Sequence, residues 1–83
     1  MDKKTIVVLV CDHRNSTETD VEIPVNISAN ELIVAINESF HLGMDTDNLY
    51  KCYLSAENPI ALLKGDKTID EFGLHDGTVI HLI

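Results

Sequence analysis

The side chains that could carry out metal, acid–base or nucleophilic chemistry are few and widely spaced. The four histidines are His13, His41, His75 and His81. They form no HxH or HExxH pair, so their spacing gives no indication of a zinc site. A two-iron, two-sulfur cluster needs four thiolates, and the chain has only two cysteines. Neither pattern predicts a metal centre.

An acidic segment and the two cysteines are the remaining candidates. Residues 45–47 (DTD) begin like a calcium-binding loop, but Leu49 stands at the third ligand position. Cys11 and Cys52 lie in apolar segments, where burial disfavours the reactive thiolate. The sequence also contains no nucleophile elbow, P-loop or GxGxxG motif. We therefore predict a non-enzyme without a cofactor, in which both thiols are reduced.

Composition and charge narrow the class of protein further. The 83 residues predict one domain, residues 1–83, and 45% apolar content with a mean hydropathy of +0.05 is typical of a folded chain. The net charge of −8 disfavours nucleic acid and anionic membranes as partners. The longest apolar run, Ile6–Cys11, is too short to insert into a membrane. Because no small-residue cleavage site follows that run, we read no signal peptide and expect a cytoplasmic protein.

Two strands begin the chain. Residues 5–11 (TIVVLVC) are rich in β-branched residues, which favours a strand over a helix. Polar residues 12–20 form the expected loop, and Val21, Ile23 and Val25 then alternate with polar residues in the pattern of a half-buried strand. Pro24 lacks an amide proton, which places this second strand at a sheet edge.

A helix over about 28–41 follows. Ser28 and Glu31 have the spacing of a capping box, in which each side chain binds the other residue's amide. Gly43 is the expected left-handed stop. Four apolar residues share one face of the predicted helix: Leu32, Ile33, Ile36 and Phe40.

The remaining pattern completes a small α+β fold. Strands are expected at 49–54, 60–63 and 78–83, with a short helical turn at about 69–72 before the last strand. The simplest topology is a β-grasp: a mixed sheet of four to five strands, with one main helix on one face. The last strand then lies in the centre, parallel to the first.

This topology leaves one face of the sheet without a helix. Six consecutive positions of the first strand are apolar, so one of two triplets must lie on the uncovered face: Ile6, Val8 and Val10, or Val7, Leu9 and Cys11. Three exposed aliphatic residues on a central strand indicate a partner surface. The alternatives are cover by long neighbouring side chains and ordinary surface hydrophobicity. An aliphatic strip beside an edge strand could also support a weak homodimer.

With its final segment placed, the chain resembles ubiquitin-like β-grasp proteins, and in particular the bacterial YukD/EsaB-type members. The resemblance rests on DVEIP at 20–24, Ile27, ELI at 31–33 and an Asp76–Gly77 turn followed by a strand that ends the sequence. The segment TIDEFGLHDGTVIHL at 68–82 is similar to the end of ubiquitin. The resemblance directs one set of side chains in the first strand inward and the other outward: Val7, Leu9 and Cys11 toward the helix, and Ile6, Val8 and Val10 away from it. The predicted protein-binding face is therefore Ile6, Val8, Val10, His81 and Ile83.

The resemblance implies an accessory protein of the WXG100, or type VII, secretion systems of Gram-positive bacteria, which binds protein components of that machinery. Conjugated modifiers and sulfur carriers of the ThiS/MoaD kind carry a Gly-Gly tail, and this sequence stops at Ile83. We therefore expect a protein that is not conjugated. Two alternatives stay open: an adaptor domain of another bacterial pathway, including a piece of a larger membrane protein, and a carrier whose tail is missing.

Overall fold

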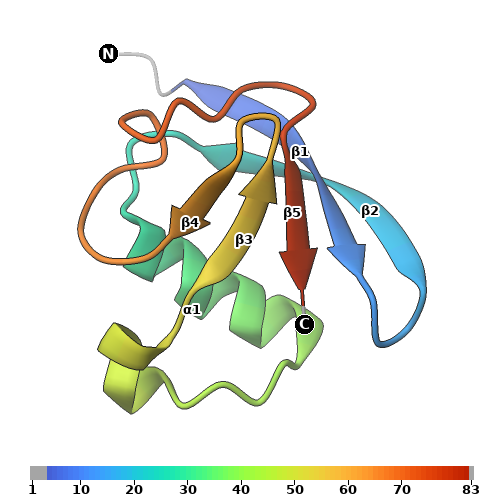
Figure 1. Cartoon of the computed structure of the whole chain (residues 1–83), viewed down its shortest axis with the longest axis vertical. Helices are drawn as coiled ribbons and strands as arrows, with labels where there is room; N and C mark the ends of the chain where they lie inside the picture. The colour runs from blue at the N-terminus through green and yellow to red at the C-terminus, as the bar shows by residue number, and fades with distance from the viewer. Residues whose placement is uncertain (1–3, 83) are drawn as a thin grey trace.

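The computed structural model describes residues 4–82. This part of the chain contains five strands and one α-helix, whose arrangement can be followed in Figure 1. In chain order the elements are β1 (Thr5–Asp12), β2 (Thr17–Pro24), α1 (Ala29–Phe40), the 3-10 helix η1 (Thr46–Lys51), β3 (Leu54–Glu57), β4 (Ala61–Leu63) and β5 (Val79–Leu82).

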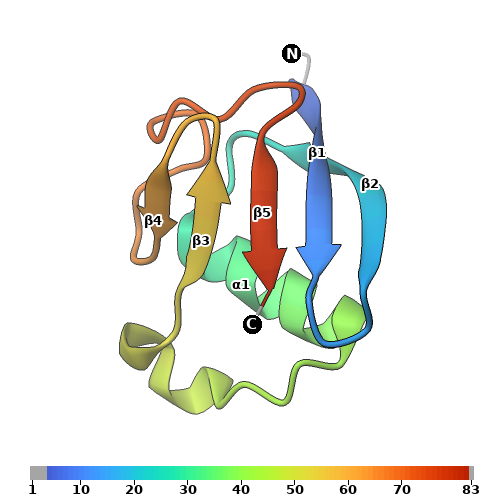
Figure 2. The same ribbon diagram turned by 45° about the vertical axis from the view of Figure 1, so that its right-hand side comes forward.

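The strands form one mixed sheet in the order β2-β1-β5-β3-β4. Strand β5 lies in the centre, parallel to β1 and antiparallel to β3, and β2 pairs antiparallel with β1 at the edge. In Figure 2 α1 crosses behind the sheet, and the face turned to the viewer carries no helix. The β-grasp topology, the central last strand and the edge position of β2 are thus confirmed.

Helix α1 begins as its sequence predicts. Ser28 Oγ accepts a hydrogen bond from the Glu31 amide at 3.1 Å, and the Glu31 carboxylate accepts one from the Ser28 amide at 3.0 Å. The end of the helix differs from the prediction, because His41 rather than Gly43 supplies the left-handed C-cap, with φ of 54°. Gly43 is also left-handed, with φ of 72°, and turns the chain two residues later.

One predicted strand lies further along the chain than expected. It was predicted at 49–54, but residues 49–51 belong to η1 and the strand begins at Leu54 as β3. Asp45 caps η1 by accepting from the Asp47 amide at 3.2 Å. Local capping overrides the alternating pattern there. The predicted helical turn at about 69–72 is present as a single turn, in which the Phe72 amide donates to the Thr68 carbonyl at 3.1 Å, four residues earlier, as in an α-helix. The loop between β1 and β2 is also shorter than predicted, since β2 begins at Thr17.

The core lies between α1 and the inner face of the sheet. Leu32, Ile33 and Ile36 are the apolar residues with which α1 covers that face. Each fully buried aliphatic side chain contributes about 1.5–3 kcal/mol by leaving water. The largest fully buried aliphatic residues are Val8, Val10, Leu32, Ile33, Leu63, Ile69, Ile80 and Leu82.

Candidate protein-binding face

The first strand faces the helix with the opposite triplet to the one predicted. Ile6 is 4% exposed, and Val8 and Val10 are 0% exposed. The register explains this orientation, because residues opposite one another in a sheet point to the same side. Ile6 lies opposite the buried Ile23, and Val10 lies beside the buried Ile80. The assignment of Ile6, Val8 and Val10 to the outer face was therefore wrong.

The uncovered face instead displays the alternate residues of β1 and their neighbours on β5. Val7 is 43% exposed, and Leu9 and Val79, which lie side by side, are half-buried. Cys11 also belongs to this face but is buried. We call Val7, Leu9 and Val79 the central strip.

A second apolar group lies across the sheet from the central strip. Tyr53, just before β3, is 42% exposed, and Leu62 on β4 is 53% exposed. Leu62 lies opposite Ser55, and Ser55 lies opposite His81, so these three residues form one row across the uncovered face. Of the predicted site, His81 therefore lies on this face, whereas Ile83 is outside the described residues.

Carboxylates border the central strip on both sides. Glu22 and Asp20 on β2 lie opposite Val7 and Leu9, respectively. On the other side, Glu57 on β3 lies opposite Val79. The face is therefore apolar in the middle and acidic at its rim, which matches a partner with an apolar centre and basic surroundings.

His81 connects the two sides of this face through a chain of polar contacts. Its Nε2 lies 2.7 Å from a Glu57 carboxylate oxygen, and its Nδ1 lies 2.9 Å from Nε2 of His13. The two imidazole planes differ by 16°. This arrangement needs a proton between the two rings, and protonation of both imidazoles would turn both facing nitrogens into donors. The contact between His13 and His81 is thus compatible with at most one charged ring.

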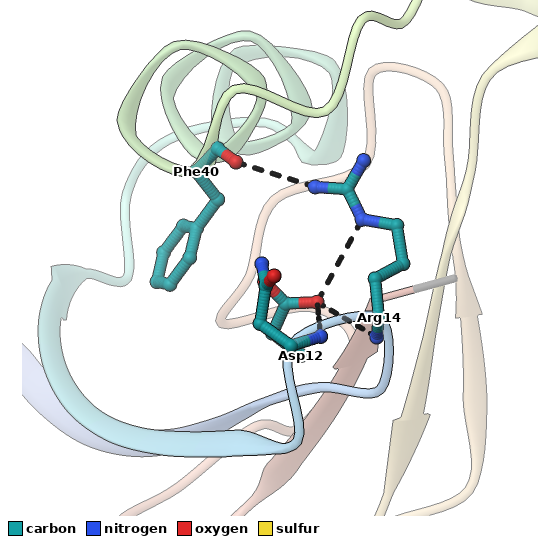
Figure 3. Close-up of polar contacts among 4 residues, drawn as sticks. Asp12, Arg14 and Phe40 are labelled. Carbon is teal, nitrogen blue, oxygen red and sulfur yellow. Dashed lines mark hydrogen bonds and ion pairs between the residues drawn. The ribbon is translucent and has the colours of Figure 1, made fainter.

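The turn between β1 and β2 is held by the buried carboxylate of Asp12. Asn15 donates its side-chain amide to this carboxylate at 2.8 Å, and the Arg14 backbone amide donates at 3.0 Å. These bonds, with the side-chain bond from Asn15 as the largest cause, lower the pKa of Asp12. Figure 3 shows the Arg14 guanidinium between Asp12 and the carbonyl of Phe40, to which it donates at 3.4 Å. A cation at the last turn of α1 also complements the helix dipole.

Both cysteines are free and buried. Burial raises the pKa of the Cys11 thiol, and the nearby Glu18 carboxylate raises it further. The Cys11 Sγ donates weakly to Glu18 at 3.9 Å. A thiol in this setting stays protonated at neutral pH and is a poor nucleophile.

Residues 4–82 offer neither a cluster of metal ligands nor a membrane-spanning helix. No three histidine, cysteine or acidic side chains in this range are grouped so that they could hold a metal ion. Among the described helices, none has the length and apolar character needed to cross a membrane.

Comparison with known structures places the fold. The chain is similar to the C-terminal ubiquitin-like domain of mouse tubulin-specific chaperone e, with a TM-score of 0.73 and 9% identity over 98% of this chain and 87% of that one. It is also similar to the ubiquitin-like domain of tubulin-binding cofactor B, with a TM-score of 0.71 and 13% identity over 96% of this chain and 89% of that one. The ubiquitin-like domain of Plasmodium falciparum Dsk2 has a TM-score of 0.65 and 19% identity, over 94% of this chain and 95% of that one. At these identities the likeness establishes a ubiquitin-like fold.

The family is established by sequence. No curated protein matches the chain. Residues 5–82, however, match the family model described as "WXG100 protein secretion system (Wss), protein YukD". With this match over nearly the whole sequence, and with the ubiquitin-like fold, the chain belongs to the YukD family of the WXG100 protein secretion system.

Proposed function

We propose that this protein is a non-conjugated, non-enzymatic accessory protein of the WXG100 secretion system, which acts in the cytoplasm by binding another protein of that system. The observation that carries this proposal is the uncovered sheet face, where apolar side chains stay exposed on strands whose alternate side chains form the core. Membership in a family of the WXG100 secretion system supports the choice of a partner from that system.

The side chains on this face indicate what kind of partner surface it would bind. Val7, Leu9 and Val79 offer a narrow apolar strip, and Tyr53 and Leu62 extend the apolar surface across the sheet. Binding would bury this area, and burial of apolar surface is the main favourable term in protein association. Because carboxylates flank the strip, we infer a partner surface with an apolar centre and lysine or arginine at its rim.

Binding rather than catalysis is supported by the state of the reactive groups. Both thiols are buried, and Cys11 is held in its protonated form by burial and by Glu18. His13 and His81 are in hydrogen-bonding contact with each other, and His81 also contacts Glu57. These groups shape a polar border for the apolar strip.

The proposal is tested with purified proteins of one WXG100 secretion system, each titrated with the wild-type chain by isothermal calorimetry. Val7→Asp and Leu62→Asp place a charge on the uncovered face, and we expect each to weaken binding by about tenfold or more, as for a central interface residue. Glu38→Lys, a change of charge on the exposed side of α1, is the matched control and should bind like wild type. Binding of Val7→Asp and Leu62→Asp with wild-type affinity would overturn the proposal, as would the absence of any binding protein in the system.

A further inference from the structure

The outer edge of β2 is a second candidate surface, separate from the uncovered face. Within the described residues β2 has a neighbouring strand on one side only. It is eight residues long, Thr17–Pro24, and it pairs with β1 over its whole length. A long edge strand offers a row of backbone donors and acceptors to another polypeptide.

The pairing register shows which backbone groups point outward. The Val25 amide donates to the Lys4 carbonyl at 3.1 Å, so Val25 directs its backbone groups toward β1. In an antiparallel ladder this direction alternates, and Ile23 and Val21 therefore also point toward β1. Asp20 and Glu22 direct their amides and carbonyls to the outer edge. Pro24 offers a carbonyl there but no amide, so pairing along this edge would end at Pro24.

An apolar groove runs along the same edge on the helix side. It has a volume of about 400 Å³ and lies between β2 and α1. Its lining includes Val21, Glu22 and Ile23 from the strand, Ile27 before the helix, and Ala35, Ser39 and Phe40 from α1. Ala35 and Ser39 are small, which leaves the groove open along the helix.

The opposite side of β2 is acidic. Glu18, Asp20 and Glu22 lie on the face away from α1, opposite Cys11, Leu9 and Val7 of β1, and all three are exposed. A strand added at this edge would have side chains alternating between the two sides. One set would enter the apolar groove, and the other would lie beside the three carboxylates.

We propose that β2 binds an extended polypeptide segment as a sixth strand, and that this segment alternates apolar residues with lysine or arginine. Its backbone pairs with the outward amides and carbonyls of Asp20 and Glu22, its apolar residues fill the groove beside Ala35, and its basic residues pair with the carboxylates. Strand addition of this kind draws affinity from the backbone and specificity from alternate side chains. The proposal goes beyond the binding role of the uncovered face and uses different contacts.

A second copy of the chain does not fit this edge. Two β2 strands side by side would place their acidic residues opposite one another, and like charges opposite each other in a sheet are destabilising. The glutamate and aspartate residues therefore select a basic partner and oppose self-association. The weak homodimer that the edge strand suggests is disfavoured at this position.

The test uses a fluorescein-labelled peptide of eight residues with alternating isoleucine and lysine, titrated with the full chain and followed by anisotropy. A peptide of alternating isoleucine and glutamate is the charge control, and a peptide of the same isoleucine–lysine composition with its isoleucines grouped is the pattern control. We expect saturable binding of the alternating lysine peptide alone, weakened by 0.5 M salt because the charges are screened. Nitrogen–proton correlation spectra should show the largest shifts at the amides of Asp20 and Glu22.

Variants separate the backbone, the groove and the charge. Glu22→Pro removes an outward amide without removing a bond to β1, and we expect it to bind the peptide about tenfold more weakly. Glu22→Gln keeps the amide and removes only the charge, so its affinity for the peptide should fall by only about threefold. Ala35→Arg narrows the groove and repels a basic segment, and we expect it to weaken peptide binding by about tenfold or more. Because arginine is well tolerated in a helix, this weaker binding cannot be ascribed to unfolding. Asp47→Asn, which removes an exposed carboxylate in η1 outside the groove, is the matched charge control and should bind the peptide like wild type. Three results would each overturn the proposal. The glutamate peptide could bind as tightly as the lysine peptide, or both Glu22→Pro and Ala35→Arg could bind the lysine peptide like wild type. The third is a dimer through β2, detected by sedimentation.

Discussion

Ser28 and Thr68 lie opposite each other in an isolated antiparallel bridge, and each begins a capping box. Thr68 Oγ1 accepts from the Glu71 amide at 3.2 Å, and Glu71 accepts from the Thr68 amide at 2.9 Å. The same exchange joins Ser28 to Glu31. The start of α1 and the turn that leads to β5 are thereby held together at one point.

Loss of either cap should destabilise the fold. We expect Ser28→Ala and Thr68→Ala each to lower the free energy of unfolding by about 1 kcal/mol, the usual effect of removing an N-cap side chain. Because the two residues share a bridge, the double variant should depart from the sum of the single changes by about 0.5 kcal/mol or more. Urea unfolding of the four proteins measures this coupling. Strict additivity would show that the two caps act separately.

The orientation of β1 gives a paired prediction. Val8→Ala should cost about 2 kcal/mol of stability, because Val8 is fully buried and its loss leaves a cavity. Val7→Ala, one position along the strand, should change stability by about 0.5 kcal/mol or less, since Val7 is exposed. Thermal or urea unfolding tests the pair. The reverse order of the two effects would contradict the inward orientation of Val8.

Asp12 makes stability depend on acid pH. Its pKa is lowered in the folded state, first by the side-chain bond from Asn15, so the carboxylate stabilises the fold fully above the ordinary aspartate pKa of about 3.9. This contribution is lost as pH falls through the lower, folded-state pKa. We expect Asn15→Ala to raise the pKa of Asp12 in a carbon-detected NMR titration. An unchanged pKa in that variant would exclude Asn15 as the main cause.

Cys11 should be slow to react. Its raised pKa, caused by burial and by Glu18, keeps the thiol protonated until the pH exceeds the ordinary cysteine value of about 8.5. The Cys52→Ser variant isolates this thiol, and its alkylation by iodoacetamide should have a pH midpoint above that of the urea-unfolded chain. Adding Glu18→Gln should move the midpoint downward. A midpoint at or below that of the unfolded chain would contradict this account.

The parts of the fold that were predicted are those that depend on neighbouring residues. The Ser28–Glu31 capping box marks the start of α1, and Pro24 marks β2 as an edge, because both signals act within a few residues. The turn at Asp45 was missed because the alternation in 49–54 resembles a strand, whereas Asp45 caps a 3-10 helix that extends into this segment as far as Lys51.

The orientation of β1 could not be read from its own residues. With six apolar residues in a row, β1 has no alternation to show which triplet is buried, and its pairing with Ile23 and Ile80 decides. The sequence of the second strand indicates the orientation of β1 better, through Val21, Ile23 and Val25. Once the register is known, the buried residues of β2 determine which residues of β1 are buried. The groove beside β2 depends on how α1 lies against the sheet, which is a property of the whole fold.

The most direct test of the uncovered face is site-specific photo-cross-linking in cells that produce the secretion system. A benzoylphenylalanine residue is placed at Val7, at Leu62 or, as a control on the exposed side of α1, at Glu38, and cross-linked proteins are identified by mass spectrometry. We predict adducts with a protein of the WXG100 secretion system from positions 7 and 62 and none of that adduct from position 38. Adducts with such a protein from position 38 alone would show that the uncovered face is not where this partner binds.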